Sequence, residues 1–203
     1  MEITKTLDQV TVADPRSAMF AIVNRTTGAS RPIKLEDHHR RFASVTLNKS
    51  VPEEVKSAFA VAANLYVYSW FVYAFGSVAE LQCLATLEFA LRIRSGDRKN
   101  GPGLKKYLRD AIAKNWLIDE GLPDPVAIPV VKLVDGQILV VPPEAPSAEI
   151  DPQARVRHLS NSLPNWRNVI AHGSSMLFPP GNYMLVLVAA LINQLWPARS
   201  NAD

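Results

Sequence analysis

Apolar residues recur at helical spacing through most of the chain after residue 50. Four stretches have this spacing: 52–75, 78–94, 103–118 and 182–196. In the second stretch, Leu84, Leu87 and Leu91 follow one another at steps of three or four residues, which places their side chains on one face of a helix. We therefore predict a mainly α-helical fold, arranged as an up-and-down helical bundle.

Charged residues and glycines mark the ends of the first helices. Pro52 favours a helix start, because proline fits the first turn of a helix. Glu53 and Glu54 follow it, and acidic side chains stabilise the positive end of the helix dipole. Gly76-Ser77 indicates a kink or a tight connection after the first helix, which we expect to reach about Phe75.

Two further helices are predicted between residues 151 and 173. Asp151 and Pro152 favour the start of the first one. Pro164 cannot continue that helix, but it suits the first turn of a new one. Gly173 fits the C-cap position, so the second helix is expected to be short.

Two segments depart from the helical pattern. Residues 18–24 and 41–48 are short and rich in β-formers, so 1–50 is predicted as an N-terminal extended or β arm. The segment 121–150 is rich in proline, and Asp135-Gly136 separates two β-branched runs within it, which predicts a β-hairpin near 126–141. We expect this hairpin to be an insertion that lies against one helical domain spanning 51–203.

Composition places the chain among globular proteins. Hydrophobic residues make up 48% and charged residues 20%, which argues against disorder along the whole chain. Cys83 is the single cysteine, so an internal disulfide and a cysteine-based zinc site are excluded. Because Cys83 lies among leucines, we expect it in the core.

A cytoplasmic location without membrane insertion is expected. The N-terminal residues contain no apolar signal-peptide stretch, and the single cysteine fits a reducing compartment. The run 58–75 is nearly long and apolar enough to resemble a short membrane span. However, it contains Asn64 and three tyrosines and has no clear basic anchors, which favours a helix buried in the bundle.

Basic residues are concentrated in one stretch, although the formal net charge is only +3. Between residues 92 and 114 the chain has eight basic residues and two acidic ones. This pattern is typical of a solvated helix face, and it also fits a surface that meets phosphates. The candidates for RNA binding are Arg92, Arg94, Lys105, Lys106 and Arg109.

The stretch SLPNWRNVIAHG at 162–173 has the strongest chemical pattern. Asn168 and His172 are four residues apart and share a helix face, and Arg167 lies about 140° around the helix from His172. Histidine can move a proton near neutral pH, arginine can hold a phosphate through two hydrogen bonds, and asparagine can orient the histidine or bind substrate. These types suit phosphodiester cleavage in which ribose supplies its own nucleophile and no metal is needed. By residue type alone, structural hydrogen bonding by this arginine and histidine is the more common role.

The pattern Arg167-Asn168-x-x-x-His172 resembles the signature of the HEPN superfamily. Trp166 before it and Gly173 after it are also similar to many members. The stretch YSWFVYAFGSVAELQCLATLEFALRIR, followed by GLKKYLRDAIAKNWL, resembles an uncharacterised bacterial HEPN subgroup. The likeness covers roughly 53–120 and 151–197, and it leaves out the arm and the hairpin insertion.

The resemblance implies a HEPN-like bundle and a metal-independent endoribonuclease that leaves 2′,3′-cyclic phosphate ends. Such proteins are often toxins or defence effectors, and they commonly form homodimers in which two motifs share one cleft. On this resemblance Arg167 would bind the scissile phosphate, His172 would act as acid or base, and Asn168 would assist. RNA, a second copy and an antitoxin protein are the implied partners, with no cofactor and no metal. Some members are instead non-catalytic modules for dimerisation or for binding RNA or nucleotides, and this alternative stays open.

Other residues leave alternatives open. Glu88 lies in the apolar stretch LATLEFAL, where a carboxylate needs a partner, either Arg167 or His172 across the bundle or Arg92 on its own helix. His38 and His39 are adjacent, but further ligands for a metal are not evident. The tyrosines and tryptophan within 66–73 favour a core or dimer surface over a platform for base stacking.

Overall fold

The computed structural model describes residues 4–24, 26–97, 101–123, 130–134, 137–141, 151–172 and 181–198. The fold is mainly α-helical, as predicted. The helices are α1 Leu35–Ala43, α2 Glu53–Tyr68, α3 Phe75–Ser95, α4 Leu104–Ala113, α5 Ala154–Ala171 and α6 Tyr183–Leu195. The strands are β1 Ala21–Val23, β2 Ser30–Pro32, β3 Val130–Val134 and β4 Gln137–Val141, and two short 3-10 helices lie at Leu7–Gln9 and Pro15–Met19.

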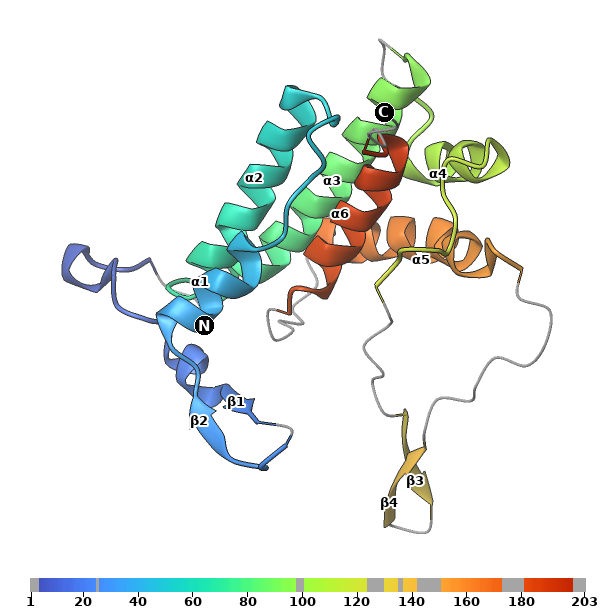
Figure 1. Ribbon diagram of the computed structural model, residues 1–203. Coiled ribbons are helices and arrows are strands. Elements are labelled where there is room, and N and C mark those ends of the chain that lie inside the picture. The colour runs from blue at the N-terminus through green and yellow to red at the C-terminus, as the bar shows by residue number, and fades with distance from the viewer. Residues whose placement is uncertain are drawn as a thin grey trace, which may run out of the picture.

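Helix α3 is the centre of the bundle and packs against α2, α4, α5 and α6. Its apolar residues are buried on several sides, and Leu84, Leu87 and Leu91 are fully buried against neighbours that include Leu187 and Leu191 of α6. Figure 1 shows α2, α3 and α6 running side by side, whereas α4 and α5 cross them at a steep angle. The up-and-down arrangement therefore describes α2 and α3, and the motif helix α5 lies across it.

The first predicted helix ends earlier than its apolar pattern indicates. Helix α2 stops at Tyr68, and the turn after it contains backbone hydrogen bonds from Phe71 to Tyr68 and from Phe75 to Val72. The apolar run continues through this turn because Tyr73 is buried there. Gly76, which was expected to mark a kink or connection, lies inside the first turn of α3.

One face of the long apolar run 58–75 is buried within the bundle, whereas Val61 and Tyr68 of the same run are exposed. Val55, Phe59, Ala62 and Tyr66 form the inner face of α2, and Cys83 of α3 is fully buried, as predicted for this cysteine. Among the helices that the structure describes, none combines the length and the apolar character needed to cross a membrane.

Helix α5 is continuous through Pro164, so the prediction of two separate helices is wrong. Proline lacks the N–H that would bond to the preceding turn, and this costs the helix stability. Two features compensate for it. The Asp119 carboxylate accepts hydrogen bonds from the N–H groups of Arg155 (2.8 Å) and Val156 (2.9 Å). Buried Val156 and Leu163 also dock one face of the helix on the core.

The N-terminal fifty residues contain a helix as well as strands. The predicted strand at 18–24 contains β1, which pairs antiparallel with β2. The strand predicted at 41–48 is wrong, because helix α1 occupies Leu35–Ala43. The cause is a helical spacing within this segment, since His38 and Phe42 are four residues apart and both are buried against α2.

Strands β3 and β4 form the predicted hairpin. They pair antiparallel with Val134 opposite Gln137, so two residues connect them, as the Asp135-Gly136 pattern predicts. The expected packing of this hairpin against the bundle depends on side chains outside the described part, and it stays a prediction.

Candidate functional site

Helix α5 presents the residues of the motif in different directions. Arg167 is half-buried and turned toward α3, whereas Asn168 and His172 are exposed. The backbone N–H of His172 donates to the Asn168 carbonyl at 2.9 Å, which closes the last turn of the helix. Five residues correspond to about 140° of rotation, so Arg167 and His172 face apart within one chain.

Arg167 forms an ion pair across the bundle. Its Nη2 atom lies 3.6 Å from Oε2 of Glu88 on α3, and the two side chains are 41% and 24% exposed. The separation exceeds a hydrogen-bond distance, and among the described residues none donates a hydrogen bond to the buried Oε2 atom. Of the partners expected for Glu88, the structure gives Arg167. Arg92 instead lies over the Phe89 ring, at 5.2 Å from its centroid.

A hollow of about 360 Å³ lies beside this pair. It is lined by Ala85, Glu88, Phe89, Arg92, Gly101, Tyr107 and Arg167. Two guanidinium groups share this space with one carboxylate, which suits a phosphate group, because arginine binds phosphate oxygens through charge-assisted hydrogen bonds. Neither Asn168 nor His172 lines the hollow, so one chain brings together only part of the predicted site.

Tyr107 and Gly101 form one wall of the hollow, and sequence reasoning missed both. The Tyr107 hydroxyl donates to Asp97 Oδ2 at 3.0 Å, and burial raises the pKa of this tyrosine above its ordinary value. A Cβ atom at Gly101 would lie 1.6 Å from the Tyr107 hydroxyl oxygen, so only glycine fits while Tyr107 keeps this position. The glycine-rich sequence before α4 is the signal that could have identified Gly101.

A second acid on α3 holds the residue next to Arg167. The indole Nε1 of Trp166 donates to Glu80 Oε2 at 2.9 Å. Burial raises the pKa of Glu80, and the hydrogen bond from Trp166 partly opposes that shift. Glu80 and Glu88 are eight residues apart, which corresponds to about 12 Å along α3. The adjacent residues Trp166 and Arg167 of α5 therefore contact α3 at two separate positions along its axis. Glu80 was not predicted, because its partner is visible only in the tertiary structure.

The predicted RNA-binding residues do not form a single cluster. Only Arg92 joins Arg167 at the hollow. Arg94 lies over the Trp116 ring at 5.1 Å, and Lys106 pairs with Asp110 at 2.7 Å. Arg109 donates to Asn161 Oδ1 at 3.3 Å, and Lys105 is exposed on the same helix, α4.

The adjacent histidines have different environments. His38 is 5% exposed, and its Nε2 atom lies 2.9 Å from the Tyr66 carbonyl oxygen, whereas His39 is exposed. Across the described ranges, histidine, cysteine and acidic residues form no group of three that could hold a metal ion. His38 therefore has a structural role in this fold.

No protein-family model, no curated protein and no solved structure matches the chain. The HEPN resemblance thus depends on the motif residues and on their helical context.

Proposed function

We propose that this chain is a metal-independent endoribonuclease of the HEPN type that acts as a homodimer. The observation that carries the proposal is the placement of Arg167. It lies with Arg92 at the rim of a hollow, while Asn168 and His172 are exposed at the end of the same helix. Phosphate binding and proton transfer are thus available within a few turns of one another.

In the proposed reaction the ribose 2′-oxygen attacks the neighbouring phosphorus, and the bond from phosphorus to the 5′-oxygen breaks. One group must take the proton of the 2′-hydroxyl, and another must give a proton to the leaving 5′-oxygen. Exposed His172 suits either transfer, because an imidazole has one nitrogen that can accept a proton and one that can donate it. Arg167 and Arg92 would stabilise the additional negative charge of the transition state, with Asn168 orienting substrate or imidazole.

A second copy of the chain supplies what one chain lacks in this proposal. Arg167 and His172 face apart on α5, so a cleft that contains both is more easily built from the Arg167 of one protomer and the His172 of the other. Val169, between these residues on α5, is 49% exposed and provides an apolar contact for such a dimer.

The experiment that tests the proposal is cleavage of a mixed RNA by the purified protein in EDTA. The parent is compared with Arg167→Ala, His172→Ala and, as a matched surface control on α5, Asn165→Ala. We expect cyclic-phosphate ends from the parent and the control, and a loss of at least a hundredfold from the other two. Equal cleavage by all four folded proteins would show that the proposed roles are wrong.

A specific observation favours a second candidate, a non-catalytic HEPN module that binds RNA or a partner protein. Arg167 is already engaged by Glu88, and it does not meet His172 within the chain. This module would bind RNA without turnover, and the binding would weaken with salt if phosphates dominate. A role as a toxin with a neutralising antitoxin belongs to the first candidate, and co-purification of a partner that stops cleavage would support it.

A further inference from the structure

A second hollow lies on a different part of the molecule, between α1 and the C-terminal end of α2. Its volume is about 710 Å³. The lining residues are Leu35, Glu36, His39, Arg40, Ala43, Ser44, Val67, Tyr68 and Phe71. Five of them, from Leu35 to Ala43, recur at helical spacing on one face of α1, and Ser44 is the C-cap of that helix. We call the hollow that these residues form with Val67, Tyr68 and Phe71 the α1–α2 groove.

Aromatic packing beneath the α1–α2 groove fixes its shape. His38 contacts the Tyr66 and Val67 carbonyl oxygens through Nε2, at 2.9 and 3.2 Å. The Phe42 ring stacks on the Tyr66 ring with centroids 4.8 Å apart and an interplanar angle of 5°. Because α1 is held to α2 by buried side chains, its outer face is presented in a defined position.

Two aromatic residues, exposed Tyr68 and half-buried Phe71, line one side of the α1–α2 groove. Tyr68 is 56% exposed, and its ring centroid lies 6.4 Å from that of Phe71. The other tyrosines of this segment behave differently, since Tyr66 and Tyr73 are buried. Exposed aromatic faces of this kind can stack with nucleobases, and each stacked base contributes about 1–3 kcal/mol.

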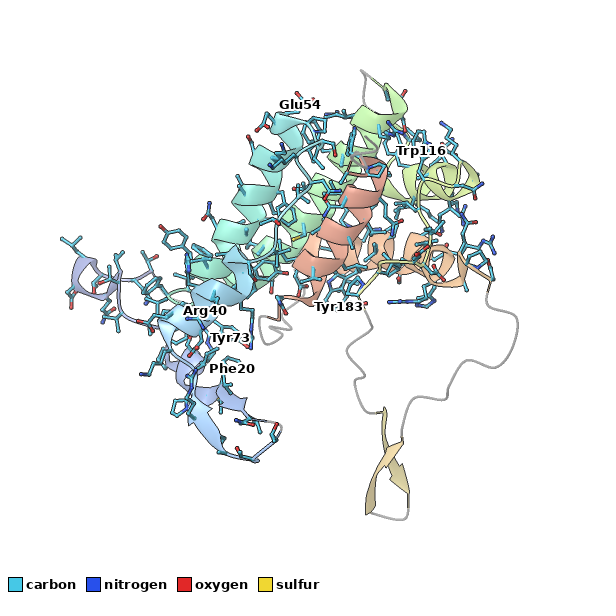
Figure 2. The ribbon with its side chains drawn as sticks, viewed as in Figure 1. Phe20, Arg40, Glu54, Tyr73, Trp116 and Tyr183 are labelled. Carbon is cyan, nitrogen blue, oxygen red and sulfur yellow. The ribbon has the colours of Figure 1, made fainter. Side chains whose placement is uncertain are left out.

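The α1 side provides two basic side chains, His39 and Arg40, and the charge of Arg40 contributes to the lowered pKa of Asp37 on the same helix. Within the part of the chain that the structure describes, neither the His39 imidazole nor the Arg40 guanidinium forms a hydrogen bond or an ion pair. Arg31, in contrast, binds Asp37 through two hydrogen bonds, at 2.6 and 2.8 Å. Figure 2 shows Arg40 on the side of the molecule away from Trp116. Glu36 is the acidic residue of the groove, one helical turn before Arg40, and could accept a hydrogen bond from the amino group of a base.

We propose that the α1–α2 groove binds a segment of single-stranded RNA. A base stacks on Tyr68, and its phosphate lies at Arg40 and His39. A combination of an exposed aromatic face and basic side chains is typical of proteins that bind single-stranded nucleic acids. The groove consists of α1 and α2, whereas the Arg167 hollow consists of α3, α4 and α5 together with Gly101, so the groove is a second RNA contact. The choice of RNA rests on the proposed function, but the test below does not depend on cleavage.

The test is fluorescence anisotropy with a labelled single-stranded 2′-O-methyl RNA, which cannot be cleaved by 2′-hydroxyl attack. Tyr68→Ala is expected to weaken binding about tenfold, and Tyr68→Phe, which keeps the ring, less than about threefold. Val61→Ala serves as the matched control, because Val61 is also an exposed residue of α2. Because the probe cannot be cleaved, its binding at the α1–α2 groove is measured whether or not the nuclease proposal holds.

A charge variant tests the phosphate contact. Arg40→Gln is expected to lower the slope of log affinity against log salt by about 0.7, the value for one phosphate contact to a single strand. The proposal is overturned if the parent does not bind the probe, or if Tyr68→Ala binds as tightly as the parent. Tighter binding of the matched DNA would overturn RNA as the ligand. If Tyr68→Ala dissociates an oligomer and leaves RNA binding unchanged, the groove is instead a contact with a second copy of the chain.

Discussion

At the scale of single residues, buried polar groups connect the helices through specific hydrogen bonds. His38 joins α1 to the end of α2, and Trp166 joins α5 to Glu80 of α3. Such groups are costly to bury without a partner, so each one fixes how two elements fit together. His38 is itself titratable, and Trp166 contacts the titratable Glu80. The contribution of each residue to the free energy of unfolding can therefore be measured.

The stability of the protein should depend on pH through His38. Burial lowers the pKa of His38 below its ordinary value of 6.5, so the unfolded chain binds a proton more readily than the folded one. The contribution is fully present above about pH 6.5 and is lost as the pH falls through that value toward the folded pKa. Urea unfolding of the parent and His38→Gln at pH 8 and pH 5.5 measures it. The parent should lose more stability than the variant, and an equal loss would contradict this role.

Removing the indole N–H of Trp166 should destabilise the fold. Trp166→Phe keeps an aromatic ring but leaves the half-buried Glu80 carboxyl without that donor, with an expected cost of about 1–3 kcal/mol. In a Glu80→Gln background the same change should cost less, because no buried charge remains to be satisfied. Denaturant unfolding of the four proteins forms a double-mutant cycle, and additive effects would argue against coupling of the two residues.

Some of the site could be predicted from residue types and some could not. The apolar surroundings of Glu88 predicted that it needs a partner, either across the bundle or on its own helix, and the structure pairs it with Arg167. Glu80 looked equivalent to any acid on an amphipathic helix, because only the crossing of α5 over α3 brings Trp166 to it. Gly101 was missed for a similar reason, since the Tyr107 ring that excludes a side chain there lies on the next helix.

At the scale of elements, the start of the motif helix depends on a residue remote in sequence. Asp119 accepts two backbone hydrogen bonds from the first turn of α5, at 2.8 and 2.9 Å. Gln153 adds a contact, since its amide donates to the Ile112 carbonyl at the end of α4 and to the Leu117 carbonyl in the connection that follows. The position of α5, and of Arg167 with it, is thus set by the connection after α4.

Replacing the remote cap should weaken this helix. Asp119→Ala removes an acceptor of two N–H groups and a negative charge at a helix N-terminus, with an expected cost of about 1–2 kcal/mol. Asp119→Asn keeps an acceptor and should cost less. Thermal melts with a neighbouring surface control, Glu120→Ala, measure the difference. Unchanged melting of Asp119→Ala would mean that water replaces the cap.

The elements that could be predicted are those whose signal is local. The leucine spacing of α3, the apolar run of α6 and the Asp135-Gly136 turn each determine one element without help from the rest of the chain. The continuity of α5 could not be predicted from the sequence, because Pro164 locally favours a break in the helix. Contacts with residues that are distant in the sequence stabilise the helix and outweigh that preference. Helix α1 was obscured by β-forming residues that follow it at 45–47.

At the scale of the whole molecule, the proposed function requires two chains. If each cleft takes Arg167 from one protomer and His172 from the other, a dimer of Arg167→Ala and His172→Ala protomers contains one intact cleft. Random mixing of the two inactive proteins should then restore about a quarter of the parent activity. Cleavage is measured before and after the proteins are mixed and allowed to exchange subunits. No recovery, with exchange verified by size analysis of tagged chains, would mean that both residues must act from the same chain.

The central position of α3 has a consequence for cooperativity. Because α3 packs against α2, α4, α5 and α6, it cannot separate from the bundle without exposing the core of all of them (Figure 1). Its opening therefore requires global unfolding, whereas a peripheral element such as the β1–β2 hairpin can open at lower cost. A residue on α3 is then coupled to the stability of the entire domain. Glu80 and Glu88, which contact the motif helix α5, therefore lie on the helix that unfolds last.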